Sequence, residues 1–195
     1  MIVYWTSYCG VKVLDALYCH TNYVGRENLP AGQPFILASN HISNIDPFLL
    51  GACQWRRFNY LAKMELFDTP AKNWFFRQVG AIPIKRGTSD FRALREALRR
   101  MKAGTPLILF PEGTRGYSER PKEPQPGVGF LTRKSGLPVV PARIEGSDKA
   151  LPPGAKWFKS HQVKVVFGRP IAFRPEEDYP AVAQRILEAI YALKV

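Results

Sequence analysis

Short, mostly apolar runs alternate along the chain with longer stretches in which apolar positions recur at helical spacing. The runs occupy 35–39, 58–62, 80–84, 107–110, 139–144 and 163–167. Apolar runs of this length are typical of strands that are buried on both faces of a sheet. Helical spacing marks 3–19, 47–53, 64–79 with a break at Pro70, 89–103, 127–134 and 180–193. Strands that alternate with helices indicate an α/β fold.

The alternation predicts a single domain with a central, largely parallel mixed sheet that is flanked by helices and preceded by a short N-terminal apolar helix. We place that helix in residues 1–21 and the main domain in 22–195, because no internal repeat or linker divides the chain. The stretch 89–103 is the clearest amphipathic helix. Its predicted core-facing residues are Phe91, Leu94, Ala97, Leu98 and Met101.

Composition narrows the class of partner. The chain has 195 residues, of which 46% are hydrophobic and 23% charged, so a disordered protein is excluded. Lys and Arg total 28 against 16 for Asp and Glu, which gives a net charge of +12. A surplus of this size favours an anionic partner: a nucleic acid, a membrane surface or a phosphorylated substrate. Charge alone does not choose among the three.

The N-terminal stretch and the cysteines indicate the compartment. Residues 1–19 lack a basic region before their apolar stretch and a convincing cleavage site, so we predict no signal peptide. Lys12 and Asp15 interrupt the stretch, and no other segment supplies the roughly 20 apolar residues of a membrane-spanning helix. Three cysteines without a Cys-x-x-Cys pair favour reduced thiols in a cytosolic setting. A membrane contact would therefore lie on the surface of the bilayer.

The most informative stretch runs from Asn40 to Pro47. His41 follows a predicted buried strand, and Asp46 lies five residues later at a predicted helix start, with Pro47 at the first helical position. A sharp turn between them would bring the carboxylate to one imidazole nitrogen, which would fix the tautomer and leave the other nitrogen free to take a proton. The alternative is that Asp46 only caps the helix and His41 is only a polar loop residue.

A second stretch, Phe110–Gly116, begins where another predicted buried strand ends. Its glycines would let the backbone approach a ligand, and Arg115 could grip a phosphate through two parallel hydrogen bonds. Glu112 could orient Arg115 or bind a substrate hydroxyl. The alternative is an ordinary solvated turn.

Two further stretches follow strands or form them. Lys85 and Arg86 meet Gly87 just before a predicted helix, a place that suits an anion, although a basic solvated loop is the simpler interpretation. Pro138–Pro141 brackets a strand and is more readily explained as architecture, such as a wall for an apolar chain.

The sequence lacks the motifs of several common kinds of enzyme. The sequence has no Gly-x-Ser-x-Gly elbow and no phosphate-binding Gly-x-x-x-x-Gly-Lys-Ser/Thr loop. The histidines are His20, His41 and His161, and none has metal-ligand spacing, so we expect no metal. A His/Asp pair without a protein nucleophile suits the removal of a proton from a hydroxyl that the substrate supplies.

Taken in their order along the chain, these four stretches resemble the motifs of the glycerolipid acyltransferases. The bacterial type of this family of lysophospholipid acyltransferases is 1-acyl-sn-glycerol-3-phosphate acyltransferase. The resemblance spans roughly 22–170. The His-x-x-x-x-Asp motif and three others correspond to His41–Asp46, Gly80–Gly87, Phe110–Arg115 and Pro138–Pro141. The chain departs from the usual pattern at Ala142-Arg143, where an apolar pair is more common.

The resemblance implies that the fold is like that of glycerol-3-phosphate acyltransferase and that the protein is an acyltransferase. The reaction would move an acyl group from acyl-CoA or acyl-carrier protein, with no other cofactor, to the hydroxyl of 1-acyl-sn-glycerol-3-phosphate, giving phosphatidic acid. It further implies that His41 is the general base and Asp46 its orienting partner. The implied substrate-binding residues are Lys85, Arg86, Gly87, Glu112, Gly113, Thr114 and Arg115.

The resemblance and the charge together predict peripheral or monotopic attachment to an anionic membrane, on the cytoplasmic face of the cell membrane. Residues 1–21 would associate with the bilayer, and Tyr4, Trp5 and Trp74–Phe76 would lie at headgroup level unless they belong to the core. One alternative is an acyltransferase for another lysophospholipid or a lyso-aminolipid. Another is a non-catalytic basic protein that binds lipid or nucleic acid, but no nucleic-acid-binding motif occurs, so we expect no nucleic-acid partner.

Overall fold

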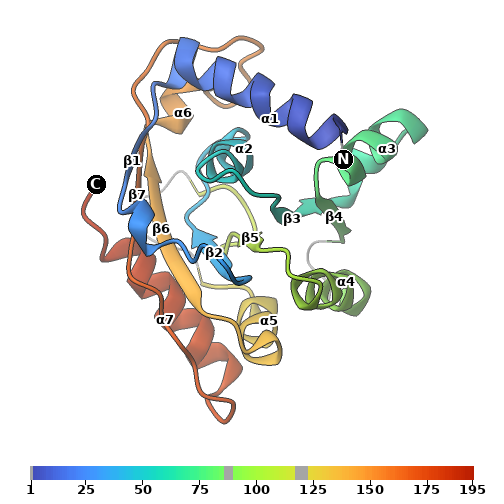
Figure 1. Ribbon diagram of the computed structural model, residues 1–195, viewed down its shortest axis with the longest axis vertical. Helices are drawn as coiled ribbons and strands as arrows, with labels where there is room; N and C mark the ends of the chain where they lie inside the picture. The colour runs from blue at the N-terminus through green and yellow to red at the C-terminus, as the bar shows by residue number, and fades with distance from the viewer. Residues whose placement is uncertain (1, 86–89, 117–122) are drawn as a thin grey trace.

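A seven-stranded sheet runs through the computed structural model, which describes residues 2–85, 90–116 and 123–195 (Figure 1). The strand order is β1-β7-β6-β2-β5-β3-β4. The strands are β1 (Asn22–Val24), β2 (Ile36–Ser39), β3 (Asn59–Lys63), β4 (Ala81–Ile84), β5 (Leu107–Leu109), β6 (Val139–Glu145) and β7 (Lys164–Phe167). Only the β6–β7 pair is antiparallel among these strand pairs. The predicted largely parallel mixed sheet is therefore confirmed.

Helices cover both faces of this sheet (Figure 1). They are α1 (Ile2–Leu14), α2 (Asp46–Gly51), α3 (Pro70–Gln78), α4 (Phe91–Lys102), α5 (Pro126–Ser135), α6 (Ser147–Ala150) and α7 (Tyr179–Tyr191). Helices α4, α5 and α7 pack on one face, and α2 and α6 pack on the other, where α1 lies over α2. A π-helical segment, Asp15–Cys19, continues α1, and two short 3-10 segments, Arg26–Asn28 and Met64–Phe67, complete the elements.

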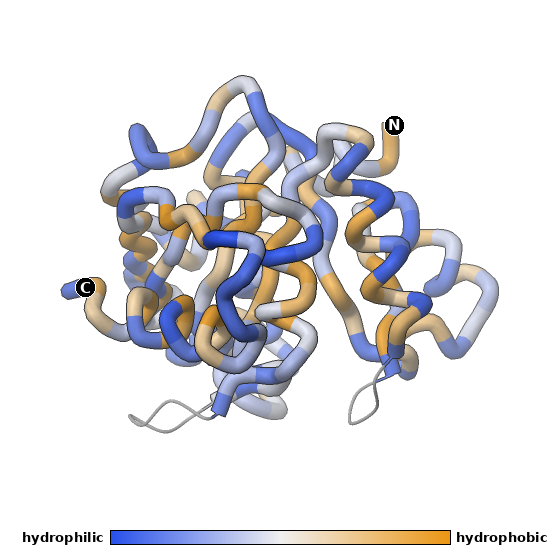
Figure 2. Tube along the Cα trace, turned by 90° about the horizontal axis from the view of Figure 1, so that it is seen from below, coloured by the Kyte–Doolittle hydropathy of each residue, from blue (hydrophilic) through white to orange (hydrophobic). Residues whose placement is uncertain are grey.

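Strand β2 is apolar from Ile36 to Ala38 because both of its faces are covered. Ile36 and Ala38 face the core under α4, α5 and α7, whereas Leu37 faces the core on the α2 side. Successive strand residues point to opposite faces, so a central strand covered on both sides needs apolar residues at every position. In Figure 2, hydrophobic stretches of the trace lie mainly toward the middle of the molecule, and hydrophilic stretches lie mainly at its periphery.

The structure has the predicted elements, with boundaries shifted by one or a few residues. Pro70 breaks the 64–79 stretch as expected, because it begins α3, with the Thr69 hydroxyl accepting a hydrogen bond from the backbone N–H of Lys72. Phe91 is an exception to the predicted core, since it is 53% exposed. It is the first residue of α4, and its ring makes a T-shaped contact with the ring of Phe130 in α5.

Sheet topology positions the candidate site. Strands β6, β2, β5, β3 and β4 are parallel to one another, so their carboxyl ends meet at one edge of the sheet. Loops at that edge of a parallel sheet commonly carry ligand sites. The loops after β6, β2 and β5 are neighbours there, because β2 lies between the other two strands.

None of the helices among the described residues is both long and apolar enough to cross a bilayer.

Candidate active site

His41 and Asp46 are in direct contact at the carboxyl end of β2. His41 Nδ1 lies 2.9 Å from Asp46 Oδ2. Asp46 is fully buried, and the His41 side chain is 10% exposed. The sharp turn between the two residues therefore brings the carboxylate to one imidazole nitrogen.

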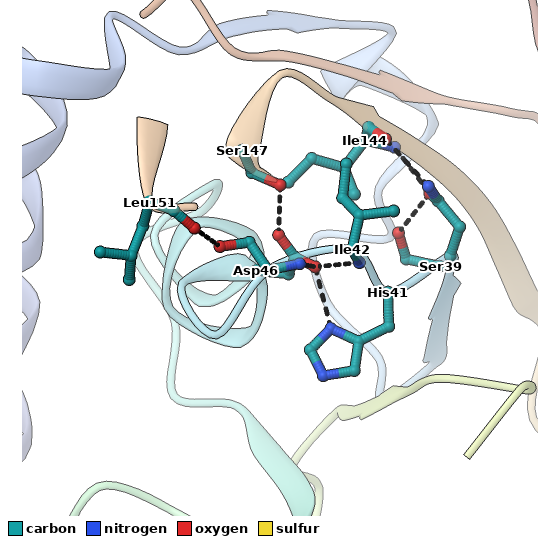
Figure 3. Close-up of polar contacts among 9 residues, drawn as sticks. Ser39, His41, Ile42, Asp46, Ile144, Ser147 and Leu151 are labelled. Atoms are coloured by element: carbon teal, nitrogen blue, oxygen red, sulfur yellow. Dashed lines mark hydrogen bonds and ion pairs between the residues drawn. The ribbon is translucent and has the colours of Figure 1, made fainter. Parts of the chain in front are cut away.

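The Asp46 carboxylate receives three more hydrogen bonds (Figure 3). The backbone N–H groups of Ile42 and Ser43 both donate to Oδ2 at 2.7 Å, and the Ser147 hydroxyl donates to Oδ1 at 2.6 Å. An ionised carboxylate only accepts hydrogen bonds, and these donors satisfy both of its oxygens. We infer that His41 Nδ1 carries a proton and donates it to Oδ2, which leaves the lone pair on Nε2.

The alternative in which Asp46 only caps a helix is wrong. Helix α2 begins at Asp46 with Pro47 at its first turn, but no side chain caps this helix. The carboxylate instead points back into the loop, because the N–H groups of Ile42 and Ser43 converge on it. It therefore organises the residues before the helix.

Asn40 fixes where this loop leaves the sheet. Its side-chain oxygen accepts from the backbone N–H of Ile144 at 2.8 Å, and its side-chain nitrogen donates to the Ile144 carbonyl at 2.9 Å. The regular pairing of β2 with β6 ends at Ser39, so the amide continues the ladder by one more step with a side chain. Neither this role nor that of Ser147 has a signal in the sequence, because both depend on β6 lying beside β2.

The turn after β5 holds the other side of the imidazole. The Phe110 ring stacks on His41 with centroids 4.2 Å apart and planes inclined by 23°. The backbone N–H of Gly116 donates to the His41 carbonyl at 2.8 Å. The His-x-x-x-x-Asp and Glu-Gly-Thr-Arg stretches are thus brought together.

Nε2 of His41 points away from Asp46 (Figure 3) and has no hydrogen-bond partner among the residues described. The nearby hydroxyls are already engaged, since Ser43 donates to the Leu151 carbonyl and Ser147 donates to Asp46. Burial raises the pKa of the Cys53 thiol to about 12, so this thiol is not a ready nucleophile. The arrangement suits proton removal from a group that a substrate brings.

Glu112 is buried, at 3% exposure, and its Oε1 accepts a hydrogen bond from the hydroxyl of Tyr191 in α7. It forms no ion pair with Arg115, so the expected orientation of Arg115 by Glu112 is not seen. Arg115 is half-buried and has no ion-pair partner among the described part of the chain. Thr114 is exposed.

The glycines of this turn serve the turn itself. Gly113 has a φ of +68°, a conformation that other residues rarely adopt, and a Cβ there would lie 2.6 Å from Gln125 Cγ. A Cβ at Gly116 would lie 2.6 Å from Glu112 Oε2. Both glycines are therefore needed for internal packing, whatever ligand approaches.

Lys85 lies farther along the same edge, after β4. Its backbone N–H donates to Asp90 Oδ2 at 3.0 Å, which is the main reason that the pKa of Asp90 is lowered. The residue is exposed and lines an open groove of about 500 Å³ together with Arg77 and Arg92. His41 does not line this groove. Arg86 and Gly87 lie outside the described residues.

No group of three or more His, Cys, Asp or Glu side chains within 2–85, 90–116 and 123–195 is arranged to hold a metal ion.

Known proteins resemble this chain in sequence. It is 31% identical over 155 residues to the chloroplastic 1-acyl-sn-glycerol-3-phosphate acyltransferase of Brassica napus, covering 77% of this chain and 45% of that protein. It is 27% identical over 163 residues to the 1-acyl-sn-glycerol-3-phosphate acyltransferase of Bacillus subtilis, covering 83% and 79%. The chain thus spans less than half the length of the plant relative. The lyso-ornithine lipid O-acyltransferase of Pseudomonas aeruginosa is 30% identical over 113 residues, covering 57% and 43%.

A solved structure and a family model extend the similarity. The crystal structure of the 1-acyl-sn-glycerophosphate acyltransferase PlsC from Thermotoga maritima superposes with a TM-score of 0.73 at 26% identity, covering 95% of this chain and 81% of that one. The model of the family described as Acyltransferase matches residues 20–145, which is more than half of the chain. That range contains His41, Asp46 and the turn after β5. The resemblance inferred from the four motifs is confirmed, and the chain belongs to the acyltransferase family.

Proposed function

We propose that this protein transfers an acyl group from acyl-CoA or acyl-carrier protein to the free hydroxyl of 1-acyl-sn-glycerol-3-phosphate, giving phosphatidic acid. One observation carries the proposal: the imidazole of His41 is tied through Nδ1 to a fully buried carboxylate, while Nε2 has no protein partner among the described residues. The relatives from Brassica napus and Bacillus subtilis are named for this acceptor.

In the proposed mechanism, Nε2 of His41 takes the proton of the acceptor hydroxyl as its oxygen attacks the thioester carbonyl. The resulting tetrahedral intermediate collapses, the carbon–sulfur bond breaks, and the imidazolium returns the proton to the leaving sulfur. Asp46 stabilises the imidazolium between these two steps. Base catalysis of this kind contributes about 10²–10⁴-fold, and positioning of the two substrates supplies much of the rest.

Arg115 is the residue best placed to bind the phosphate of the acceptor, because its turn follows β5, and β5 is the immediate neighbour of β2, which leads to His41. Glu112, Gly113 and Thr114 would shape this subsite. Lys85 follows β4, three strand positions from β2, which corresponds to roughly 14 Å across the sheet. We keep the prediction that Lys85, Arg86 and Gly87 also bind this phosphate, although Lys85 follows a strand farther from His41 than Arg115 does, and Arg86 and Gly87 lie outside the described residues.

A panel of acceptors tests the proposal. Radiolabelled acyl-CoA and acyl-carrier protein are each incubated with 1-acyl-sn-glycerol-3-phosphate, lysophosphatidylcholine, lyso-ornithine lipid or no acceptor, and the products are separated by chromatography. We expect labelled phosphatidic acid as the main product. Faster transfer to another acceptor, or no transfer to any acceptor from either donor, would contradict the proposal.

Arg115→Ala in the same panel separates phosphate recognition from catalysis. Loss of a charge-assisted hydrogen bond costs about 1.5–3 kcal/mol, so the KM for the phosphorylated acceptor should rise roughly 10- to 100-fold. Arg169→Ala is the matched control, because Arg169 is exposed and follows β7, which runs opposite to β6 and ends at the other edge of the sheet. An unchanged KM in Arg115→Ala would remove Arg115 from the subsite.

A second acceptor class has one specific observation in its favour. The similarity to the lyso-ornithine lipid O-acyltransferase covers 57% of this chain. An ornithine headgroup offers a carboxylate of charge −1 beside an ammonium group where the other acceptor has a phosphate, so Arg115 would gain less electrostatic attraction there. The panel decides between the two acceptors directly.

We further propose that the protein attaches peripherally to an anionic membrane through α1, on the cytoplasmic face. One side of α1 and its π-helical continuation exposes Ile2, Val13 and Leu17. Apolar residues along one side of a helix are typical of an interfacial anchor, and the net charge of +12 would add attraction to anionic lipid.

The aromatic residues near α1 differ in their suitability for headgroup contact. Tyr4 is buried, and its hydroxyl accepts a hydrogen bond from the backbone N–H of Phe58, so of the two alternatives Tyr4 belongs to the core. Trp5 stacks on Trp55 with centroids 4.5 Å apart, and Trp55 is itself exposed. Trp74 in the neighbouring α3 is exposed too.

Co-sedimentation with vesicles tests the attachment. We expect binding to phosphatidylcholine vesicles that contain phosphatidylglycerol, weaker binding without it, and release at high salt. Val13→Ser with Leu17→Ser should weaken binding, because each removes apolar area from the exposed side. Phe91→Ser is the control, since Phe91 is exposed on α4, which covers the opposite face of the sheet. Equal loss in both variants, or no salt-sensitive binding at all, would exclude α1 as the anchor.

A further inference from the structure

We propose that Tyr191, in the last turn of α7, is a positioning residue for acceptor binding: it holds Glu112 and, through Glu112, the turn that carries Arg115. This inference rests on the proposed function, since it concerns the same site. Tyr191 lies outside residues 20–145, so the match to the family model does not include it.

The contacts form one continuous path from α7 to the base. The Tyr191 hydroxyl donates to Glu112 Oε1. The other carboxylate oxygen, Oε2, lies so close to Gly116 that a Cβ there would come within 2.6 Å of it. The N–H of Gly116 in turn donates to the His41 carbonyl at 2.8 Å. Glu112 is therefore fixed between α7 on one side and the Arg115–Gly116 backbone on the other.

Arg143 in β6 binds the backbone and the ring of Tyr191. Its Nη1 donates to the carbonyl of Tyr191 at 2.9 Å and to that of Leu193 at 3.2 Å, and its guanidinium lies 5.4 Å from the centre of the Tyr191 ring. Arg143 is the position at which this chain departs from the apolar pair expected after the fourth motif. These contacts give a structural reason for the departure, because an apolar residue could not donate hydrogen bonds to the two carbonyls at the end of α7.

The direction of the hydrogen bond follows from the surroundings of the tyrosine. Burial and the Glu112 carboxylate raise the pKa of Tyr191 far above its usual value, and the Arg143 guanidinium opposes them only in part. The hydroxyl therefore stays protonated and donates. No other described side chain hydrogen-bonds to Glu112, so losing this donor leaves a buried carboxylate with nothing to orient it.

Tyr191→Phe tests the inference, because it deletes one hydroxyl and keeps the ring on Arg143. We expect the KM for the acceptor to rise about tenfold, while kcat and the KM for the acyl donor stay within about twofold. The matched control is Tyr179→Phe, at the other end of α7, whose hydroxyl has no hydrogen-bond partner in the described parts of the chain. All kinetic constants should be unchanged in that control.

A double-mutant cycle separates positioning from general support of the fold. If Tyr191 acts through Glu112, then Tyr191→Phe should have little further effect on the acceptor KM in a Glu112→Gln background. Arg143→Met should raise the acceptor KM in the same direction as Tyr191→Phe. Circular dichroism and thermal unfolding show whether each variant is folded.

The outcomes distinguish this inference from the proposed function. Wild-type transfer with an unchanged acceptor KM in Tyr191→Phe would overturn the inference alone. Parallel changes in kcat and both KM values would assign Tyr191 a merely structural role and would also overturn it. If wild type prefers a different acceptor, the proposed function fails, and the same comparison is made with that acceptor. No transfer by wild type to any acceptor would overturn both.

Discussion

His41→Ala should lower kcat by about 10³-fold or more, the largest effect we expect from any single change in this chain. The substitution removes the imidazole whose Nε2 has no hydrogen-bond partner among the described residues and which we propose as the base. The acceptor KM should change little, because Arg115 and the turn that carries it remain. Initial rates at saturating donor, measured over a range of acceptor concentrations, give both constants.

The fold should survive this substitution. Asp46 keeps its hydrogen bonds from the N–H groups of Ile42 and Ser43 and from the Ser147 hydroxyl, so the buried carboxylate is still satisfied. The control is His20→Asn, because His20 is exposed and has a φ of 44°, which Asn tolerates. Near-normal turnover in a folded His41→Ala variant would refute the base assignment.

Much of the fold could be predicted because the strands of a parallel sheet leave a plain signal. β5 is apolar at every position and β2 at every position but its last, Ser39, since both of their faces are covered, and no alternating pattern competes with that interpretation. Pro70 and Gly104 mark helix boundaries through their backbone chemistry, and the structure places them there. The prediction that Phe91 faces the core is wrong because helical spacing shows which side of a helix is apolar, but not whether the end of the helix is covered by neighbouring elements.

The site could be predicted only where its residues are close in sequence. His41 and Asp46 are five residues apart, so one turn joins them. Ser147 is 101 residues from Asp46, and Tyr191 is 79 residues from Glu112. These contacts follow from β6 lying beside β2 and from α7 packing against α5 and β6, and hydrophobic periodicity carries no information about such neighbours.

The same limit applies to Lys85 and Arg115. Their motifs both indicate an anion site, and the sequence gives no reason to separate them. The strand order puts β3 between β5 and β4. Lys85, after β4, therefore lies farther along the sheet from His41 than Arg115, after β5, does. We therefore expect a phosphate close to His41 to be reached more easily from the turn after β5, and for this reason Arg115 is the cation that we propose to substitute in the acceptor assay.

Asp46→Asn should lower kcat by about 10²-fold while the structure stays intact, the second largest effect we expect. In the variant, the amide oxygen takes the position of Oδ2, because the N–H groups of Ile42 and Ser43 can only donate to it. The amide nitrogen then faces the Ser147 hydroxyl, which can turn and accept. His41 Nδ1 still finds an acceptor, so its tautomer is kept and only the negative charge is lost.

Comparison with Asp46→Ala separates charge from geometry. Asp46→Ala leaves the buried N–H of Ser43 and the half-buried N–H of Ile42 without an acceptor. An unsatisfied buried donor costs about 1–3 kcal/mol, so the unfolding temperature of Asp46→Ala should fall clearly below that of Asp46→Asn. If Asp46→Asn retained kcat within about twofold of wild type, the charge would not be needed to stabilise the imidazolium.

The double variant His41→Ala/Asp46→Asn shows whether Asp46 acts only through His41. Asp46 is fully buried, so it cannot touch an acceptor or a thioester, and its effect must pass through the imidazole that it holds. Residues that act as a unit have non-additive effects, so the double variant should be no slower than His41→Ala alone. A further loss of about 10²-fold in the double variant would mean that Asp46 supports turnover by another route, such as fixing the loop that carries Ile42 and Ser43.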